Sequence, residues 1–235
     1  MLQKGFNYSQ DGPGNRLVFH LQGCNLHCPW CSNPESMAVA TVFEETEELL
    51  AFALRSRPMM FDGGGVTFTG GEPTVQFDAL KELLAGLKRN GVSNCIETNG
   101  TSAKLPMLFD LIDYLIMDFK HWNNDKLKAF TGVGNQTVLT NLRAAAERRD
   151  QLLVRIPLIN GFNASAEDAA AFVSVLRPLW HEGMKLEVLR YHEYGKDKWE
   201  KLGKEYQMQN AFVTDDQFDE FCSVLKSGSL ELTRT

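Results

Sequence analysis

The sequence lacks both a long apolar run and an excess of positive charge. No stretch of about 18 apolar residues occurs among the 235 residues, and residues 1–10 have no apolar core of signal-peptide length. Lys and Arg number 24 against 30 Asp and Glu, so the net charge of −6 disfavours non-specific binding to nucleic acid. We therefore expect a cytoplasmic protein with no nucleic-acid or membrane partner.

Cysteine is scarce and unevenly distributed. There are five cysteines, an odd number, and three of them (Cys24, Cys28 and Cys31) fall within eight residues, which argues against a disulfide framework. In a reducing compartment such clustering indicates metal binding or catalysis. Cys95 and Cys222 stand alone in apolar surroundings, and we predict that both are buried in the core.

No linker, charge block or low-complexity segment divides the chain, which predicts a single domain over residues 1–235. Short β-rich runs alternate with segments of helical period. The predicted strands are 16–22, 65–70, 93–98, 114–120, 152–158 and 185–191, and the predicted helices are 44–55, 75–91, 137–150, 165–180 and 215–226. This alternation predicts an α/β fold in which helices cover a parallel sheet, either curved into an open barrel or doubly wound.

The spacing of the three clustered cysteines favours an iron–sulfur cluster over zinc. Structural zinc usually takes four nitrogen or sulfur ligands, and no second CxxC or HxxxH follows at the usual separation. Thiolates suit an iron–sulfur cluster, and three ligands for four irons leave one iron open to a substrate. Zinc and ordinary loop cysteines remain the alternatives at this point.

The string Cys24-x3-Cys28-x2-Cys31, with Trp30 before the last cysteine, resembles the signature of the radical S-adenosylmethionine (SAM) superfamily. The resemblance continues along almost the whole chain, in the order found in the activating enzymes of glycyl radical enzymes, most nearly those that act on pyruvate formate-lyase. The strings that carry it are DGPG (11–14), TGGEP (69–73), ETNG (97–100), MDFK (117–120), LVRIPLING (153–161) and YHEYGKDKWEKLG (191–203). TGGEP alone would be an ordinary turn, whereas the ordered set is specific.

The resemblance implies a partial (β/α)6 barrel of the radical SAM type and an oxidoreductase that works anaerobically. The implied reaction is reductive cleavage of SAM, followed by abstraction of a hydrogen atom from a backbone glycine of a partner glycyl radical enzyme. The implied cofactors are a [4Fe–4S] cluster and SAM, with electrons from a flavodoxin- or ferredoxin-type donor. The alternatives are a small-molecule radical SAM enzyme, such as a 7-carboxy-7-deazaguanine synthase-like protein, and a metal-binding module without catalysis.

The same resemblance implies roles for individual residues. The cluster would be held by Cys24, Cys28 and Cys31, and the predicted SAM contacts are Trp30, Ser32, Asn33, Gly70, Gly71, Glu72, Thr98, Lys120, Arg155 and His192. Asp11 would hydrogen-bond the substrate peptide, with the DGPG turn and residues 191–199 as walls of its groove.

Two features depart from the family pattern. Glu97, Thr98 and Asp118 match a monovalent-cation site beside the SAM carboxylate, but Glu97 stands where the family has Asp. Residues 32–94 contain no cysteine, as in the compact single-cluster enzymes, whereas CSNPES (31–36) resembles activators of other glycyl radical enzymes. The sequence therefore leaves the particular partner enzyme open.

Overall fold

The computed structural model describes residues 1–148 and 151–233 and contains a seven-stranded sheet in the order β1 to β7. The strands are β1 (Gln3–Tyr8), β2 (Asn15–Leu21), β3 (Val66–Gly70), β4 (Asn94–Thr98), β5 (Tyr114–Asp118), β6 (Leu152–Leu158) and β7 (Met184–Arg190). β1 runs antiparallel to β2, whereas β2 with β3, β3 with β4 and β6 with β7 pair in parallel. The six predicted strands and the α/β class are confirmed, and β1 is an additional edge strand.

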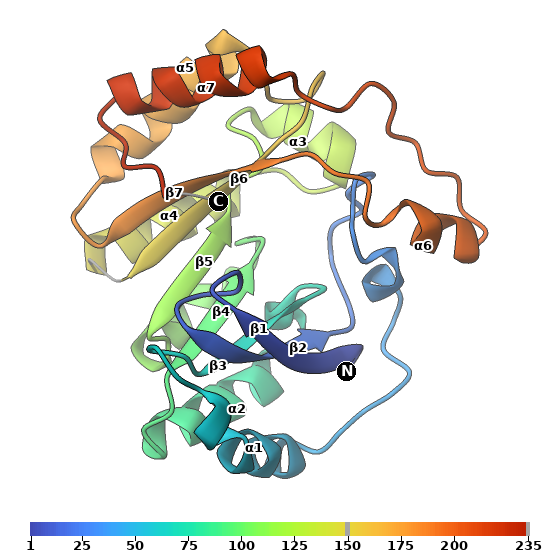
Figure 1. Cartoon of the computed structure of the whole chain (residues 1–235), viewed down its shortest axis with the longest axis vertical. Coiled ribbons are helices and arrows are strands. Elements are labelled where there is room, and N and C mark those ends of the chain that lie inside the picture. The colour runs from blue at the N-terminus through green and yellow to red at the C-terminus, as the bar shows by residue number, and fades with distance from the viewer. Residues whose placement is uncertain (149–150, 234–235) are drawn as a thin grey trace. The chain divides into compact units, whose positions relative to one another are not determined.

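The helices follow the parallel strands in the predicted alternation (Figure 1). They are α1 (Thr46–Arg55), α2 (Phe77–Arg89), α3 (Asn124–Thr131), α4 (Gln136–Arg148), α5 (Ala166–Leu176), α6 (Lys196–Lys201) and α7 (Asp215–Ser227), with 3-10 helices at Pro34–Met37, Arg57–Met59, Pro73–Gln76, Leu105–Leu111 and Arg177–Leu179. All five predicted helices are confirmed, although residues 149–150 of the third lie outside the described residues. α3 and α6 were not predicted.

The chain forms two compact units. The first comprises Met1–Asn25, Glu35–Thr98 and Ser102–Ile116, and the second comprises Leu26–Pro34, Asn99–Thr101 and Met117–Thr235. The single domain over residues 1–235 stays a prediction.

In the first unit, β2, β3 and β4 have one apolar face and one face with polar side chains. Phe19 and Phe68 lie side by side on the apolar face, with ring centroids 5.6 Å apart, and Phe19 also contacts Phe52 of α1 at 6.5 Å. The alternate residues Arg16 and Thr67 are fully buried on the opposite face, because successive side chains of a strand point to opposite sides. The helices α1 and α2 therefore do not cover the second face, which carries the polar side chains.

In the second unit, α5 and α7 lie side by side over β6 and β7 (Figure 1). Phe172 of α5 and Phe221 of α7 have ring centroids 6.0 Å apart, and both side chains are buried. Ser165 and Asp168 form a capping box that begins α5, as their spacing predicts. The opposite face of the two strands carries Arg155 and Glu187, which are neighbours in the pairing register.

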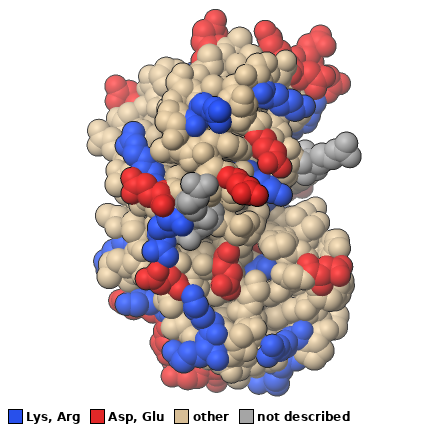
Figure 2. Space-filling view, turned by 90° about the vertical axis from the view of Figure 1, so that its left-hand side faces the viewer, with Lys and Arg blue, Asp and Glu red and all other residues tan. Residues whose placement is uncertain are grey.

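The described part of the chain has no helix long and apolar enough to cross a membrane. On the face drawn in Figure 2, Lys and Arg side chains are interspersed with Asp and Glu.

Candidate active site

The three clustered cysteines lie on the loop that follows β2. Cys28 is buried, Cys24 and Cys31 are half-buried, and all five cysteines of the chain, each in the described part, are thiols. The Cys31 backbone N–H donates to the Cys28 carbonyl at 3.1 Å, and the Asn33 N–H donates to the Cys31 Sγ at 3.4 Å. In the described ranges, no group of three or more His, Cys, Asp or Glu side chains is gathered closely enough to hold a metal ion.

The Gly70–Gly71–Glu72 loop, which follows β3, packs against the start of the cysteine loop. The Gly71 N–H donates to the Leu21 carbonyl and the Glu72 N–H to the Gly23 carbonyl, each at 2.8 Å. A Cβ on Gly71 would lie 2.2 Å from the Gly23 carbonyl oxygen, and Gly70 has a φ of +111°. Only glycines allow this contact, and it places the backbone of Glu72 beside the residue that precedes Cys24.

Glu72 is a buried carboxylate with a fixed orientation. It is 1% exposed, and its Oε1 accepts hydrogen bonds from the Thr74 N–H at 3.0 Å, from the Thr74 hydroxyl at 2.5 Å and from the Thr98 hydroxyl at 2.7 Å. Because the Glu72 side chain is buried, little water would compete with a positively charged ligand group placed beside it.

The three residues predicted to hold a cation have different surroundings. Glu97 accepts from the Thr69 hydroxyl at 2.9 Å, while its neighbour Thr98 donates to Glu72, so the two side chains point to opposite faces of β4. In the second unit, Asp118 forms an ion pair with Lys120, with 2.5 Å between Oδ2 and Nζ.

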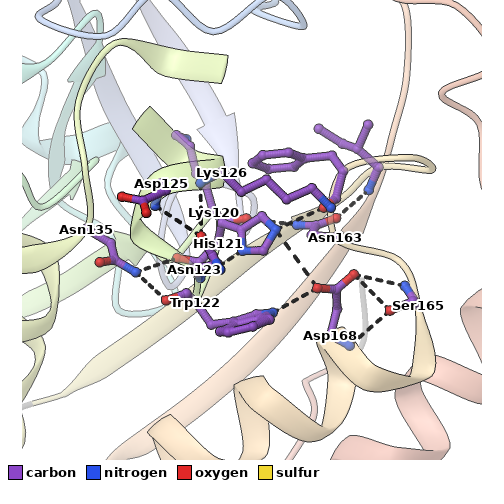
Figure 3. Close-up of polar contacts among 12 residues, drawn as sticks. Lys120, His121, Trp122, Asn123, Asp125, Lys126, Asn135, Asn163, Ser165 and Asp168 are labelled. Atoms are coloured by element: carbon purple, nitrogen blue, oxygen red, sulfur yellow. Dashed lines mark hydrogen bonds and ion pairs between the residues drawn. The ribbon is translucent and has the colours of Figure 1, made fainter. Parts of the chain in front are cut away.

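The backbone at Lys120 is held by a buried asparagine (Figure 3). Asn163 is fully buried, and its Nδ2 donates to the carbonyls of Lys120 and Pro157, each at 2.8 Å. Its Oδ1 accepts from the Ile159 N–H at 2.8 Å. The amide thus ties the segment after β5 to the segment after β6.

His121, the next residue, is a buried neutral imidazole that supports the same segment (Figure 3). Its Nδ1 accepts from the Asn123 N–H, and its Nε2 lies 2.9 Å from the Phe162 carbonyl, to which it can only donate. Burial lowers the pKa of His121 below its usual 6.5. The next residue, Trp122, donates from Nε1 to Asp168 at 2.8 Å. Asp168, which belongs to the capping box of α5, therefore also holds the segment 120–122.

Arg155 lies in the middle of β6, and His192 lies two residues beyond the end of β7, both in the second unit. Arg155 is buried on the polar face of β6, where its Nε donates to Glu187 at 2.5 Å. His192 stacks on Tyr194, with ring centroids 4.0 Å apart, and burial lowers its pKa below 6.5. The imidazole is therefore neutral at pH 7.

Trp30 and its neighbours belong to the second unit. The Trp30 ring packs against Phe162 at 4.7 Å and Phe130 at 6.2 Å, so apolar packing accounts for one side of the ring. Asn33 accepts at Oδ1 from the Lys198 ammonium at 2.6 Å. Ser32 is half-buried beside it.

Asp11 lies at the amino ends of β2 and β3. Its carbonyl accepts from the Thr67 hydroxyl at 2.7 Å, and its carboxylate accepts from the Asn7 amide. Thr67 is near the first residue of β3, whereas Gly70 is the last. Asp11 and the Gly70–Glu72 loop are thus at opposite ends of the same strand, separated by about 10 Å along it.

Several buried polar residues that position these side chains were not predicted. Arg16 donates to the Thr67 hydroxyl at 2.7 Å and to the Pro13 carbonyl at 3.2 Å, and so braces the turn that carries Asp11. Asn163 and His121 support Lys120 in the same way. These residues lie within or next to the recognised motifs in the sequence. The sequence spacing, however, does not reveal which polar residues near a motif are buried.

Comparison with known proteins identifies the class to which this site belongs. The family model of the radical SAM superfamily matches residues 18–173. The pyruvate formate-lyase-activating enzyme of Staphylococcus aureus is 32% identical over 219 residues, which cover 88% of this chain and 86% of that enzyme. The chain therefore belongs to the radical SAM superfamily and, within it, to the family of pyruvate formate-lyase-activating enzymes.

Solved structures support the fold. A domain of a pyruvate-formate lyase-activating enzyme from Bacteroides vulgatus superimposes with a TM-score of 0.60 at 24% identity, covering 72% of this chain and 98% of that domain. SuiB of Streptococcus suis, bound to its precursor peptide SuiA, gives a TM-score of 0.71 at 13% identity over 92% of this chain and 47% of SuiB. The predicted partial (β/α)6 barrel of the radical SAM type is confirmed.

Membership of this superfamily implies SAM and a [4Fe–4S] cluster. The donor set fits a cluster, since Cys24, Cys28 and Cys31 supply three thiols within eight residues of one loop. The closely packed glycines beside the start of that loop and the buried Glu72 carboxylate also fit a ligand that carries an ammonium group.

Proposed function

We propose that this protein is the activating enzyme of a glycyl radical enzyme of the pyruvate formate-lyase type. It would cleave SAM with one electron and remove a hydrogen atom from a backbone glycine of the partner. The observation that carries this proposal is the three-cysteine loop after β2 with the Gly70–Gly71–Glu72 backbone hydrogen-bonded to its start. The 32% identity to an activating enzyme over most of both chains supports the same reaction.

The cofactors would supply the radical. With the cluster and SAM bound, the cluster would accept one electron from a flavodoxin- or ferredoxin-type donor and pass it to SAM, so that a sulfur–carbon bond breaks to give methionine and a 5′-deoxyadenosyl radical, which would take the glycine hydrogen. The residues of this chain hold the cluster through Cys24, Cys28 and Cys31 and orient SAM. They would also confine the reaction to the partner's glycine.

Glu72 and the two glycines would bind the methionine end of SAM. Gly70 and Gly71 let the backbone approach the ligand, and Glu72 accepts a hydrogen bond from the ammonium group. The buried guanidinium of Arg155 and the ammonium of Lys120 supply positive charge for the carboxylate. The Nε–Glu187 bond holds the Arg155 guanidinium in one orientation.

The remaining predicted contacts would bind the adenosine part. Trp30 offers an aromatic ring fixed against Phe162, with Ser32 and Asn33 beside it as polar partners for adenine. The neutral His192 can accept a hydrogen bond from a hydroxyl. Thr98 would act through Glu72, whose carboxylate it already orients.

Asp11 would bind the substrate peptide. An extended peptide that reaches from the Gly70–Glu72 loop to Asp11 runs the length of β3, about 10 to 15 Å or four residues. Asp11 would then accept a hydrogen bond from a backbone N–H of the glycine loop. The small-molecule alternative is not favoured, because a relative that covers 88% of this chain is an activating enzyme.

Radical transfer to a partner tests this proposal. Anaerobically reconstituted, reduced protein is mixed with SAM and a pyruvate formate-lyase-type enzyme from the same genome, and the glycyl radical is measured by electron paramagnetic resonance. We expect a glycyl doublet on the partner and none when its radical-site glycine is replaced by alanine. We place the protein in the cytoplasm under anaerobic conditions, where its thiols and cluster would stay reduced.

A monovalent cation held by Glu97, Thr98 and Asp118 is a separate prediction. Carboxylates that face the SAM carboxylate without a counter-ion would repel it. We expect SAM affinity to depend on the alkali ion and Asp118→Ala to weaken SAM binding about tenfold, measured by equilibrium binding.

Because Asp118 also pairs with Lys120, the variant alone does not establish a cation. The wild-type protein is therefore titrated with SAM in sodium, in potassium and in a bulky organic cation. Equal affinities in all three would remove the cation from the site and leave the ion pair as the role of Asp118.

A further inference from the structure

The short helix α6 packs directly on the last cysteine of the cluster loop. The Trp199 Nε1–H donates to the Cys31 carbonyl at 2.9 Å, although the two residues are 168 positions apart in the sequence. Gly195, just before α6, approaches the same carbonyl so closely that a Cβ would lie 2.3 Å from its oxygen. Any other residue at position 195 would push α6 away from the loop.

A second contact joins the residue before Trp199 to the residue two positions after Cys31. The Lys198 ammonium donates to the Asn33 Oδ1 at 2.6 Å. The backbone N–H of the same asparagine donates to the Cys31 sulfur at 3.4 Å. Lys198 therefore holds a residue that contacts the sulfur of a cluster ligand and that is proposed to bind adenine.

The position of α6 is itself fixed by packing. Trp199 contacts Tyr206, with ring centroids 6.2 Å apart, and the Tyr206 hydroxyl lies 2.7 Å from that of Tyr191. Tyr191 is a buried member of an apolar cluster with Phe162, against which Trp30 and Tyr206 also pack. The helix and the cluster loop thus share one support within the second unit.

We propose that α6 braces the cluster loop, with Trp199 and Lys198 as positioning residues for Cys31 and Asn33. This inference rests on the proposed function for the cluster and SAM. Residues 195–199 would then position the SAM site, whereas the sequence predicts that they form a wall of the peptide groove. The contacts from α6 fix the positions of the Cys31 backbone and the Asn33 side chain before the cluster or SAM binds.

The variant Trp199→Phe tests the brace, because it keeps an aromatic ring and removes only the donor. We expect unchanged iron content, SAM affinity weakened about five- to tenfold, and slower SAM cleavage in the absence of any partner. The electron paramagnetic resonance spectrum of the reduced cluster with SAM should also change, because the Cys31 ligand shifts. Trp180→Phe, a half-buried tryptophan away from the loop, is the matched control and should behave as wild type.

A second pair of variants covers the case in which Trp199→Phe does not fold. Lys198→Met should weaken SAM binding, and Lys198→Arg, which retains a donor, should restore most of it. Loss of partner activation alone, with wild-type SAM affinity, spectrum and uncoupled cleavage in Trp199→Phe or Lys198→Met, would overturn the brace in favour of a groove wall. Wild-type protein that binds neither cluster nor SAM would instead overturn the proposed function and the brace with it.

Discussion

Replacing Cys28 by alanine is expected to abolish both the cluster and the cleavage of SAM. Cys28 is the most buried of the three loop cysteines, and its carbonyl closes the turn to Cys31. Removal of one of three thiolates leaves too few ligands for a cluster whose fourth iron is kept for SAM. Reconstituted wild-type protein should contain about four irons and four sulfides per chain and release 5′-deoxyadenosine when reduced. The Cys24→Ala and Cys31→Ala variants should lose both properties as well.

The two remaining cysteines provide matched controls. Cys95 is fully buried in β4. Cys222 is buried in α7, where burial raises the pKa of its thiol and so disfavours the thiolate that a metal requires. Cys95→Ala and Cys222→Ala should retain iron, sulfide and SAM cleavage. Full SAM cleavage by Cys28→Ala would contradict the assignment of the cluster ligands.

Replacing Asp11 by alanine should preserve the cleavage of SAM and impair the formation of the glycyl radical on the partner. Asp11 lies at the amino end of β3, whereas the Gly70–Glu72 loop lies at its carboxyl end, so the cluster and the SAM contacts should be untouched. The variant should bind iron and SAM and cleave SAM as the wild type does. Glycyl-radical formation on the partner, measured by electron paramagnetic resonance, should fall at least tenfold, because the peptide loses its hydrogen bond and its position.

Two further variants test whether the Asp11 carboxylate itself is responsible. Asp62→Asn changes an exposed carboxylate that accepts from the Tyr8 hydroxyl in the same unit, and it should leave radical formation unchanged. Asp11→Asn keeps an oxygen acceptor and should recover part of the yield. Undiminished radical formation in Asp11→Ala would remove Asp11 from the peptide site.

The parallel strands were predictable because they are buried and apolar between Gly-, Pro- or Asn-containing turns. β1 was missed because its string QKGFNY is almost entirely exposed and forms a strand only by pairing with β2. α6 was missed because KDKWEK is only six residues long and has no apolar face of its own. Both elements depend on contacts with residues distant in the sequence, which local patterns do not contain.

The candidate site was predictable to the extent that its chemistry is carried by contiguous strings. The cysteine loop and the glycine loop are such strings, and the structure brings the starts of the two together. The supporting residues are different, because their roles arise from burial. Arg16 is fully buried and donates to Thr67, 51 residues away, yet in the sequence it looks like any charged residue at the start of a strand. Asn163 likewise reaches Lys120 across 43 residues.

Transfer of deuterium from the partner's glycine to 5′-deoxyadenosine would follow the abstracted hydrogen atom itself. A pyruvate formate-lyase-type enzyme from the same genome is prepared with Cα-deuterated glycine and mixed with the reduced protein and SAM. The 5′-deoxyadenosine is then analysed by mass spectrometry, and the glycyl radical is counted in the same sample. We expect one deuterium per 5′-deoxyadenosine and one 5′-deoxyadenosine per glycyl radical. Cleavage of SAM that yields only unlabelled 5′-deoxyadenosine, with no radical on any glycyl radical enzyme of that genome, would contradict hydrogen-atom abstraction from the partner's glycine.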